Sequence, residues 1–234
     1  MSEPRPLIAV VVFPGSNDDR DAQQALERLG ADAVRVWHDE PALPAGTAAV
    51  VLPGGFSYGD YLRCGAIARF SPVMRAVTEF AEDGGLVLGI CNGFQILTEA
   101  GLLPGALRPN ASLAFVCRDV ALRVERADTP FTSRCHADQE LTIAVKHGEG
   151  CWFADADLLA ELEADGRLLL RYAEAENPNG AVGDVAGVLN AAGNVFGLMP
   201  HPEHAVDPLL GSTDGALILG SLVDAARLSI AVAV

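Results

Sequence analysis

The sequence has few basic residues for its length. Only 16 of its 234 residues are Lys or Arg, against 31 Asp or Glu, which gives a formal net charge of -15. The basic residues form no run, whereas a nucleic-acid surface needs clustered Lys and Arg to neutralise phosphates. We therefore expect no nucleic-acid partner. The acidity favours solubility and does not identify a substrate.

Cysteine is also scarce, and its spacing matches neither a disulfide framework nor a zinc site. The odd set Cys64, Cys91, Cys117, Cys135 and Cys151 contains no C-x-x-C pair, which fits free thiols in a reducing compartment. No signal peptide is visible, and no apolar run approaches the ~20 residues of a membrane-spanning helix. We expect a cytoplasmic protein that does not interact with membranes.

The first half of the chain alternates between two apolar patterns. Short runs rich in Val, Ile and Leu predict strands buried on both faces, and longer periodic segments predict helices. We predict strands at Leu7–Phe13, Asp32–Trp37, Ala49–Pro53 and Leu86–Ile90, and helices from an Asn17 or Asp18 cap to Gly30, at Pro72–Asp83 and at Asn92–Ala100. This alternation predicts a mostly parallel sheet with helices on both sides.

From Leu113 onward, strands follow one another without helices between them. They are predicted at Phe115–Glu125, Glu140–Lys146, Asp184–Asn190 and Val195–Met199. The expected fold is therefore α/β, a three-layer open sheet that is mostly parallel and carries an antiparallel extension. No linker is apparent, so residues 1–234 are predicted to form a single domain.

The strongest local signal is the pentapeptide GICNG (89–93), between a predicted strand and a predicted helix. This is the glycine-x-nucleophile-x-glycine elbow, in which small residues let the chain turn sharply and project the nucleophile, Cys91. The following helix N-terminus favours a thiolate and a nearby oxyanion. The alternative is a structural cysteine between two packing glycines.

A cysteine nucleophile needs a histidine that moves a proton and a third group that orients the histidine. His201 follows the predicted strand Val195–Met199, and Glu203 lies two positions further on. Residues i and i+2 share one face of an extended chain, and Pro202 favours extended backbone before it, so we expect imidazole and carboxylate side by side. The same geometry would send His204 to the opposite face.

The other histidines are weaker candidates. His38 and His136 lie in polar or turn-like surroundings and are predicted to be surface residues. His147, in the segment KHGEG (146–150), fits a loop that passes close to a ligand and a simple tight turn equally well.

The segment PGGFSYGD (53–60) follows the third predicted strand. Consecutive glycines at the carboxyl end of such a strand let backbone N–H groups face a ligand. We expect the Gly55 and Asn92 N–H groups to form an oxyanion hole, although a plain glycine-rich turn would look the same in isolation.

The glycine loop, G-x-C-x-G and H-P-E, in this order, resemble the class I (triad-type) glutamine amidotransferases, which have a flavodoxin-like sheet. The sequence is particularly similar to the amidotransferase subunits of phosphoribosylformylglycinamidine synthases of de novo purine synthesis. The matching stretches are FPGSN (13–17), PGGFSYGDYLRCGAIA (53–68), GICNGFQ (89–95), FVCRDV (115–120), KHGEG (146–150), GLMPHPEHAVDPLLGSTDG (197–215) and the C-terminal helix.

The resemblance implies a role for each matching residue. Cys91 would attack the side-chain amide of glutamine, His201 would protonate the departing ammonia and then activate water, and Glu203 would orient His201. The residues expected to contact glutamine are Gly54, Gly55, Asn92 and Gln95, with Asn110, Ser112 and Phe115 towards its backbone end.

The resemblance also implies partners. Ammonia would pass to a large ATP-dependent synthetase subunit that converts formylglycinamide ribonucleotide to the amidine, and a small bridging subunit would complete the complex. The chain has no Walker-type phosphate loop, so ATP and Mg²⁺ are assigned to the synthetase, and no cofactor or metal is expected here.

Two positions depart from the family pattern, Asp18 where Cys is common and His204 where Arg is common. The alternative functions are an amidotransferase serving another synthetase and a cysteine hydrolase of the same fold that needs no partner. A non-catalytic subunit would be expected to lack a triad member, and all three are present.

Overall fold

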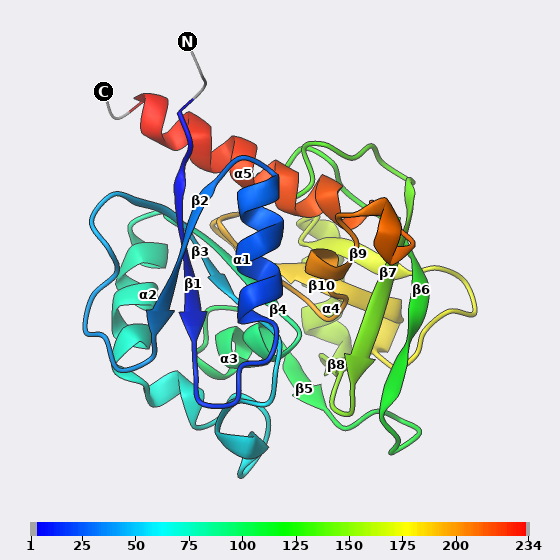
Figure 1. Ribbon diagram of the computed structural model, residues 1–234. Helices are drawn as coiled ribbons and strands as arrows, with labels where there is room; N and C mark the ends of the chain where they lie inside the picture. Colours follow the sequence, from blue (N-terminus) through cyan, green and yellow to red (C-terminus); the bar gives the residue numbers. More distant parts are fainter. Residues whose placement is uncertain (1–3, 233–234) are drawn as a thin grey trace.

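A continuous apolar run makes β1 (Leu7–Val12) a strand inside a sheet. In the computed structural model, which describes residues 4–232, β1 pairs in parallel with β2 (Asp32–Trp37) and β3 (Thr47–Leu52). Strand β3 pairs with β4 (Leu86–Ile90), and β4 pairs with β11 (Val195–Leu198), again in parallel. These five strands form the parallel half of a nine-stranded sheet (Figure 1).

The other half of the sheet is antiparallel. It continues from β11 through β10 (Val185–Leu189), β9 (Leu168–Tyr172), β6 (Val116–Val124) and β7 (Glu140–His147). The predicted architecture, a parallel sheet with an antiparallel extension, is therefore confirmed. A separate two-stranded sheet joins β5 (Ala106–Arg108) to β8 (Cys151–Phe153).

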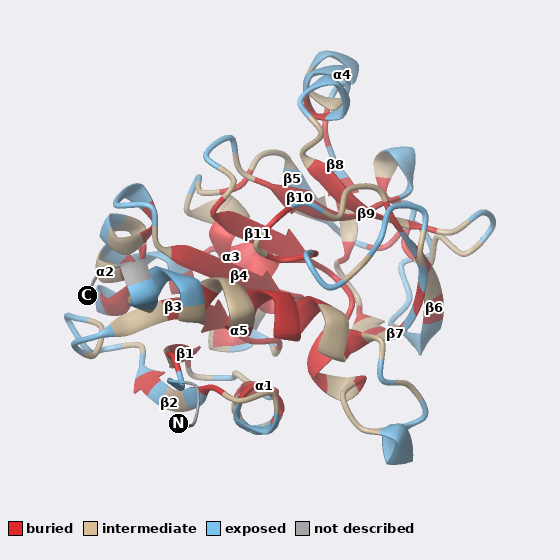
Figure 2. Ribbon diagram, turned by 90° about the horizontal axis from the view of Figure 1, so that it is seen from above, coloured by how far each residue is buried: buried red, intermediate tan, exposed pale blue. Residues whose placement is uncertain are grey.

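Four helices cover the parallel half and complete three layers (Figures 1 and 2). One face carries α1 (Asp19–Arg28) and α5 (Gly215–Val232), which contact each other, and the other carries α2 (Pro72–Glu82) and α3 (Asn92–Glu99). A fifth helix, α4 (Ala156–Ala164), joins β8 to β9. Short 3-10 helices occur at Ser57–Asp60, Ala68–Phe70, Val182–Asp184, Pro202–His204 and Pro208–Leu210.

Most predicted elements differ from the observed ones by one or two residues at an end. Sequence patterns did not predict strands β5, β8 and β9 or helix α4. Strands β5 and β8 have only three residues and carry no periodicity, and β9 is a short apolar run that could be a strand or part of a buried helix. Asp18 does occupy the N-cap position of α1, but its side chain makes no capping hydrogen bond. No helix between residues 4 and 232 combines the length and apolar character needed to cross a bilayer.

The sheet and helix layers meet in a core of fully buried side chains, drawn red in Figure 2. Phe94 of α3 is fully buried and packs so closely on β11 that a Cβ atom on Gly197 would overlap its ring. We expect Phe94→Ala to lower the free energy of unfolding by about 3–5 kcal/mol, because it removes a large apolar group and leaves a cavity.

Urea unfolding measures this loss directly. The matched control is Phe70→Ala, because Phe70 is 75 % exposed. A change of similar size for both variants would show that α3 is not held by this contact.

Candidate active site

Cys91 lies at the sharp turn between β4 and α3. Its backbone has φ 49° and ψ −103°, a conformation that is costly for a residue with a side chain. The Cys91 N–H donates a hydrogen bond to the Leu198 carbonyl of β11 at 2.8 Å, so the sheet holds the turn in place. The side chain is 3 % exposed and its Sγ lies 3.9 Å from the Lys146 carbonyl oxygen.

Both glycines of the elbow are required by close packing. A Cβ atom on Gly93 would overlap the carbonyl group of Leu52 in β3, and one on Gly89 would lie 2.7 Å from the Gly93 carbonyl. The glycines therefore let the start of α3 sit directly on the ends of β3 and β4. This approach positions Cys91 at the carboxyl edge of the parallel strands, where α/β folds bind their ligands.

His201 and Glu203 form a buried pair at the same edge. His201 Nδ1 lies 2.6 Å from Glu203 Oε1, and both side chains are almost completely inaccessible. The contact was predicted from an extended chain, and that reason is wrong, because Pro202–His204 is a 3-10 turn. The His201 N–H also donates to the Ala144 carbonyl of β7 at 2.9 Å, which fixes the backbone of the histidine.

Electrostatics favour a protonated His201. Burial alone would oppose the charge, but the carboxylate of Glu203 and the adjacent Cys91 thiol outweigh it and raise the pKa of His201 to about 10. Nδ1 is engaged by Glu203, whereas the buried Nε2 has no hydrogen-bond partner among the described residues and therefore remains for a proton transfer at Cys91, which lines the same cavity. Cys91, His201 and Glu203 therefore lie together at one edge of the sheet, with the contact between His201 and Glu203 already formed.

A second carboxylate lies beside the His201–Glu203 pair. Asp18 Oδ2 is 3.6 Å from His201 Nδ1, and Asp18 Oδ1 is 2.5 Å from Nζ of Lys146, the only lysine in the sequence. Burial would raise the pKa of Asp18, but the contact with His204 and the charges of His201 and Lys146 hold it well below its usual range. Asp18 is therefore ionised and gives this site an ion pair with Lys146.

The prediction that His204 lies on the opposite face, away from the site, is wrong. The 3-10 turn brings its Nε2 to 3.4 Å from Asp18 Oδ1 and 3.7 Å from Glu203 Oε1. Ligand atoms of Asp18, His201, Glu203 and His204 all lie within 4.8 Å of one another, the spacing of a metal site. The positive charges of His201 and Lys146 already balance these carboxylates, so the cluster does not need an ion.

Cys91 and His201 open into a cavity of about 330 Å³. Its lining residues are Asn17, Asp18, Gly55, Phe56, Asp60, Cys64, Cys91, Gln95, Phe115, Lys146, His147, Gly148, Glu149 and His201. Of the residues predicted to contact glutamine, Gly55, Gln95 and Phe115 are in this set.

Gly54 and Asn92 lie behind the cavity lining. A Cβ atom on Gly54 would overlap Asp18 and come within 2.6 Å of the His201 ring, so only glycine allows the loop to approach the histidine. The Asn92 side chain accepts from the Ser57 N–H at 3.2 Å and donates to Gln95 at 2.9 Å. Asn92 thus connects the glycine loop to α3.

Asn110 and Ser112 are outside the cavity. Asn110 is fully buried; its amide donates to the carbonyls of Ala114 and His147 and accepts from the Gly150 N–H, each at 2.9 Å. It therefore fastens the KHGEG segment from behind. Ser112 is exposed and accepts from the Ala114 N–H at 3.3 Å.

The structure places His147 in the site. Its side chain is buried, lines the cavity and contacts Asn179 through Nε2 at 3.0 Å. Burial and the nearby charge of His201 lower the pKa of His147 to about 4, so its imidazole is neutral at physiological pH. Sequence reasoning left open whether this residue was a turn residue or faced a ligand.

Three further residues line the cavity although the sequence did not indicate a role for them: Asp60, Cys64 and Glu149. All three lie in stretches that carry the family resemblance, but a single acid or thiol in a glycine-rich loop has no pattern of its own. Only the folded loops show that they meet at one cavity.

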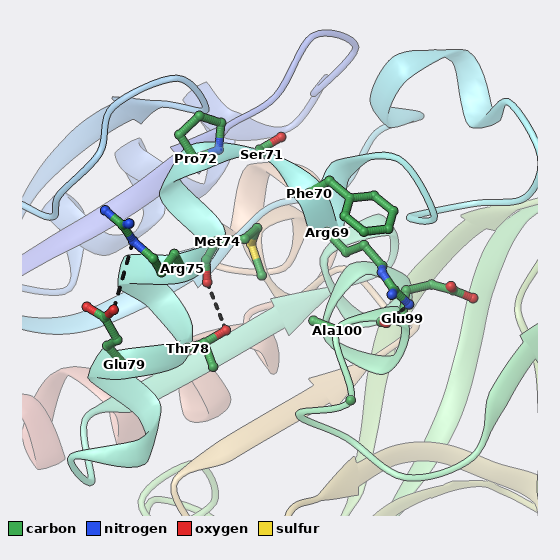
Figure 3. Close-up of a pocket in the computed structure, with 11 residues that line it drawn as sticks. Arg69, Phe70, Ser71, Pro72, Met74, Arg75, Thr78, Glu79, Glu99 and Ala100 are labelled. Atoms are coloured by element: carbon green, nitrogen blue, oxygen red, sulfur yellow. Dashed lines mark hydrogen bonds and ion pairs between the residues drawn. The ribbon is translucent and has the colours of Figure 1, made fainter.

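A larger hollow, of about 830 Å³, lies elsewhere, between the start of α2 and the end of α3 (Figure 3). There the Arg69 guanidinium lies 4.5 Å from the centre of the Phe70 ring, and Arg75 Nε lies 3.9 Å from Glu79 Oε1. Cys91, His201 and Glu203 are not among its lining residues, so the smaller cavity at Cys91 is the candidate active site.

Comparisons with known proteins identify the family of the chain. Residues 5–214 match the model of the CobB/CobQ-like glutamine amidotransferase domain. The chain is 60% identical to the phosphoribosylformylglycinamidine synthase subunit PurQ of Rubrobacter xylanophilus, over 94% of this chain and 99% of the relative, and 57% identical to that of Salinibacter ruber, over 92% and 94%.

A solved structure is similar as well. A chain in the structure of PurLQS from Thermotoga maritima superposes with a TM-score of 0.85 at 44% identity, covering 94% of this chain and 99% of that one. The chain therefore belongs to the glutamine amidotransferase family, as a member of the phosphoribosylformylglycinamidine synthase PurQ subunits.

Proposed function

We propose that Cys91, His201 and Glu203 are the catalytic triad with which this chain hydrolyses glutamine. The observation that carries the proposal is the buried 2.6 Å contact between His201 and Glu203 beside a cysteine held at positive φ. A strained nucleophile, an imidazole and an orienting carboxylate in contact are the arrangement that nucleophilic catalysis requires.

The reaction has two steps. In the first, the Cys91 thiolate attacks the amide carbon of glutamine and protonated His201 gives its proton to the departing ammonia, which leaves a glutamyl thioester and a neutral His201. In the second, His201 takes a proton from water and the resulting hydroxide attacks the thioester carbon. The C–S bond then breaks, which releases glutamate and a proton and restores the Cys91 thiolate beside protonated His201. Glu203 keeps His201 in the orientation and protonation state that both steps use.

Backbone donors stabilise the charge that develops on the amide oxygen. We assign this role to the N–H groups of Gly55 and Asn92, since one follows β3 and the other opens α3 beside Cys91. Gly54 is small enough to allow this approach, and Gln95 and Phe115 line the space for the substrate. Asn110 and Ser112 contribute by shaping the loops around it.

Ammonia from this site supplies an ATP-dependent synthetase subunit, which converts formylglycinamide ribonucleotide to formylglycinamidine ribonucleotide in purine biosynthesis. The PurQ relatives and the PurLQS structure support a complex with a large synthetase and a small third subunit. ATP and Mg²⁺ are used by the synthetase. The comparisons favour this synthetase over another nucleotide or amino-acid synthetase.

Two further assignments accompany this function. We assign residues 1–234 to a single amidotransferase domain, supported by the nine-stranded sheet that runs through both halves of the chain. We also assign the protein to the cytoplasm, supported by five cysteines that are all free.

Replacing the nucleophile should separate the two activities of the complex. In Cys91→Ala assembled with its synthetase, we expect synthesis from glutamine to be abolished and synthesis from added ammonium to remain, because only the ammonia source is removed. The measurement is the rate of amidine formation with each nitrogen donor. The control is Cys117→Ser, at an exposed thiol, which should retain both rates. Loss of both rates in Cys91→Ala would mean that Cys91 holds the complex together.

Replacing the orienting carboxylate should lower the pKa of His201. In Glu203→Gln the burial remains but the largest stabilising charge is lost, so we expect the pKa of about 10 to fall, measured by NMR titration of the His201 ring. Because the pKa of His201 is higher in the folded than in the unfolded chain, proton binding by His201 stabilises the folded state. This stabilisation is complete below about pH 6.5 and is lost as the pH rises through 10. Glu203→Gln should therefore unfold more easily than the wild type at acidic pH.

Activity gives a second readout of the same variant. We expect Glu203→Gln to impair glutamine hydrolysis less than His201→Ala, which removes a proton transfer worth about 10²–10⁴-fold. Equal losses in the two variants would contradict a purely orienting role for Glu203.

A further inference from the structure

Two carboxylates line the Cys91 cavity without taking part in the triad. Asp60 closes a 3-10 helix in the loop after β3, and Glu149 lies in the loop after β7. The carboxylate atom Asp60 Oδ1 is buried and has no hydrogen-bond partner. Two separate parts of the chain thus bring negative charge to one side of the cavity.

These charges are not compensated by the protein. Between residues 4 and 232, neither Asp60 nor Glu149 forms an ion pair, because Arg63 is engaged by Glu99 at 2.6 Å and Lys146 by Asp18 at 2.5 Å. The two carboxylates instead act on each other: burial and the charge of Glu149 raise the pKa of Asp60, although Cys64 opposes this. Such a pair is most stable when a cation lies between its members.

The Cys64 thiol lines the same cavity as these two groups. It interacts with both carboxylates, and burial together with their charges raises the pKa of Cys64, so it remains a neutral thiol. One S–H group can donate to only one carboxylate at a time. A stronger donor is therefore still needed at this point of the cavity.

Both loops are held in defined conformations. The Gln95 amide donates to the Glu149 carbonyl at 2.6 Å and is itself bound by Asn92. In the other loop, Tyr58, Asp60 and Leu62 all have positive φ. Backbone strain of this kind persists where the surrounding structure fixes it, commonly at ligand sites.

We propose that Asp60 and Glu149 bind the α-ammonium group of the glutamine substrate. The inference rests on the proposed function, since glutamine carries this group four bonds from the amide carbon that Cys91 attacks. Carboxylates bind an ammonium through charge-assisted hydrogen bonds, which here also relieve their mutual repulsion. The nucleophile and the two carboxylates thus engage opposite ends of one substrate in one cavity.

The remaining wall of the cavity is consistent with this orientation. His147 is 3 % exposed, lines the cavity, and leaves its Nδ1 without a hydrogen-bond partner. Because its pKa is lowered to about 4, it adds no positive charge that would compete with the ammonium. The residual charge of the cavity is negative, which favours a substrate with a cationic group.

The test compares glutamine with 4-carbamoylbutanoate, which is glutamine without its amino group. Hydrolysis of both would be followed in the chain assembled with its synthetase. For Asp60→Asn and Glu149→Gln, we expect kcat/KM for glutamine to fall roughly 10- to 100-fold, mainly through KM, while kcat/KM for 4-carbamoylbutanoate changes less than about threefold. Glu79→Gln, an exposed carboxylate outside the cavity, is the control and should leave both values unchanged.

The outcomes separate the competing explanations. Equal losses with both substrates in folded variants would overturn the proposal, because they would indicate a structural role or a role towards the released ammonium, which both substrates produce. Unchanged values for glutamine would overturn it as well. The two variants lie in different loops, so Glu149→Gln decides the test if Asp60→Asn does not fold. A wild type that hydrolyses neither substrate would contradict the proposed function itself.

Discussion

The parallel pairing of β4 with β11 is the constraint on which the active site depends. It places Ile90 opposite Leu198, so that the chain leaves the sheet towards Cys91 on one strand and towards His201 on the next. The backbone hydrogen bond from Cys91 to Leu198 continues the ladder into the turn itself. Cys91 and His201 are more than a hundred residues apart in sequence, and this pairing brings them together at one edge.

The antiparallel half of the sheet completes the site. Strand β7 accepts a hydrogen bond from the His201 backbone and then delivers Lys146, His147 and Glu149 to the cavity. The resulting site is rich in charge, and its most deeply buried charged groups are paired, Asp18 with Lys146 and Glu203 with His201. A positive φ at Cys91 costs about 1–3 kcal/mol, and the surrounding sheet and helix packing maintain it.

Much of the fold was predictable because local sequence patterns identify most of its strands and helices. Runs such as LIAVVV and LVLGI are apolar on both faces, which only a central strand requires, and the order of strands and helices then specifies a parallel sheet. The elbow glycines and the His-x-Glu spacing pointed to Cys91, His201 and Glu203. The comparisons with known proteins confirmed the family that these motifs had indicated.

What the sequence did not reveal depends on contacts between distant loops. Asn17 or Asp18 was expected to cap α1, yet the Asp18 side chain makes no capping hydrogen bond and instead contacts Lys146 and His201. His204 was expected on the opposite face and was placed by a 3-10 turn that Pro202 begins. No sequence pattern connects Asp60 with Glu149, and only the folded structure shows that their two loops line the same cavity.

The central claim is that Cys91 is a nucleophile in a cavity shaped for glutamine. The most direct measurement is to treat the chain, assembled with its synthetase, with a glutamine analogue that carries an electrophilic diazoketone, and to map the adduct by mass spectrometry. We expect a single adduct on Cys91 that excess glutamine prevents. Absence of an adduct, or labelling spread over Cys64, Cys117, Cys135 and Cys151, would contradict it.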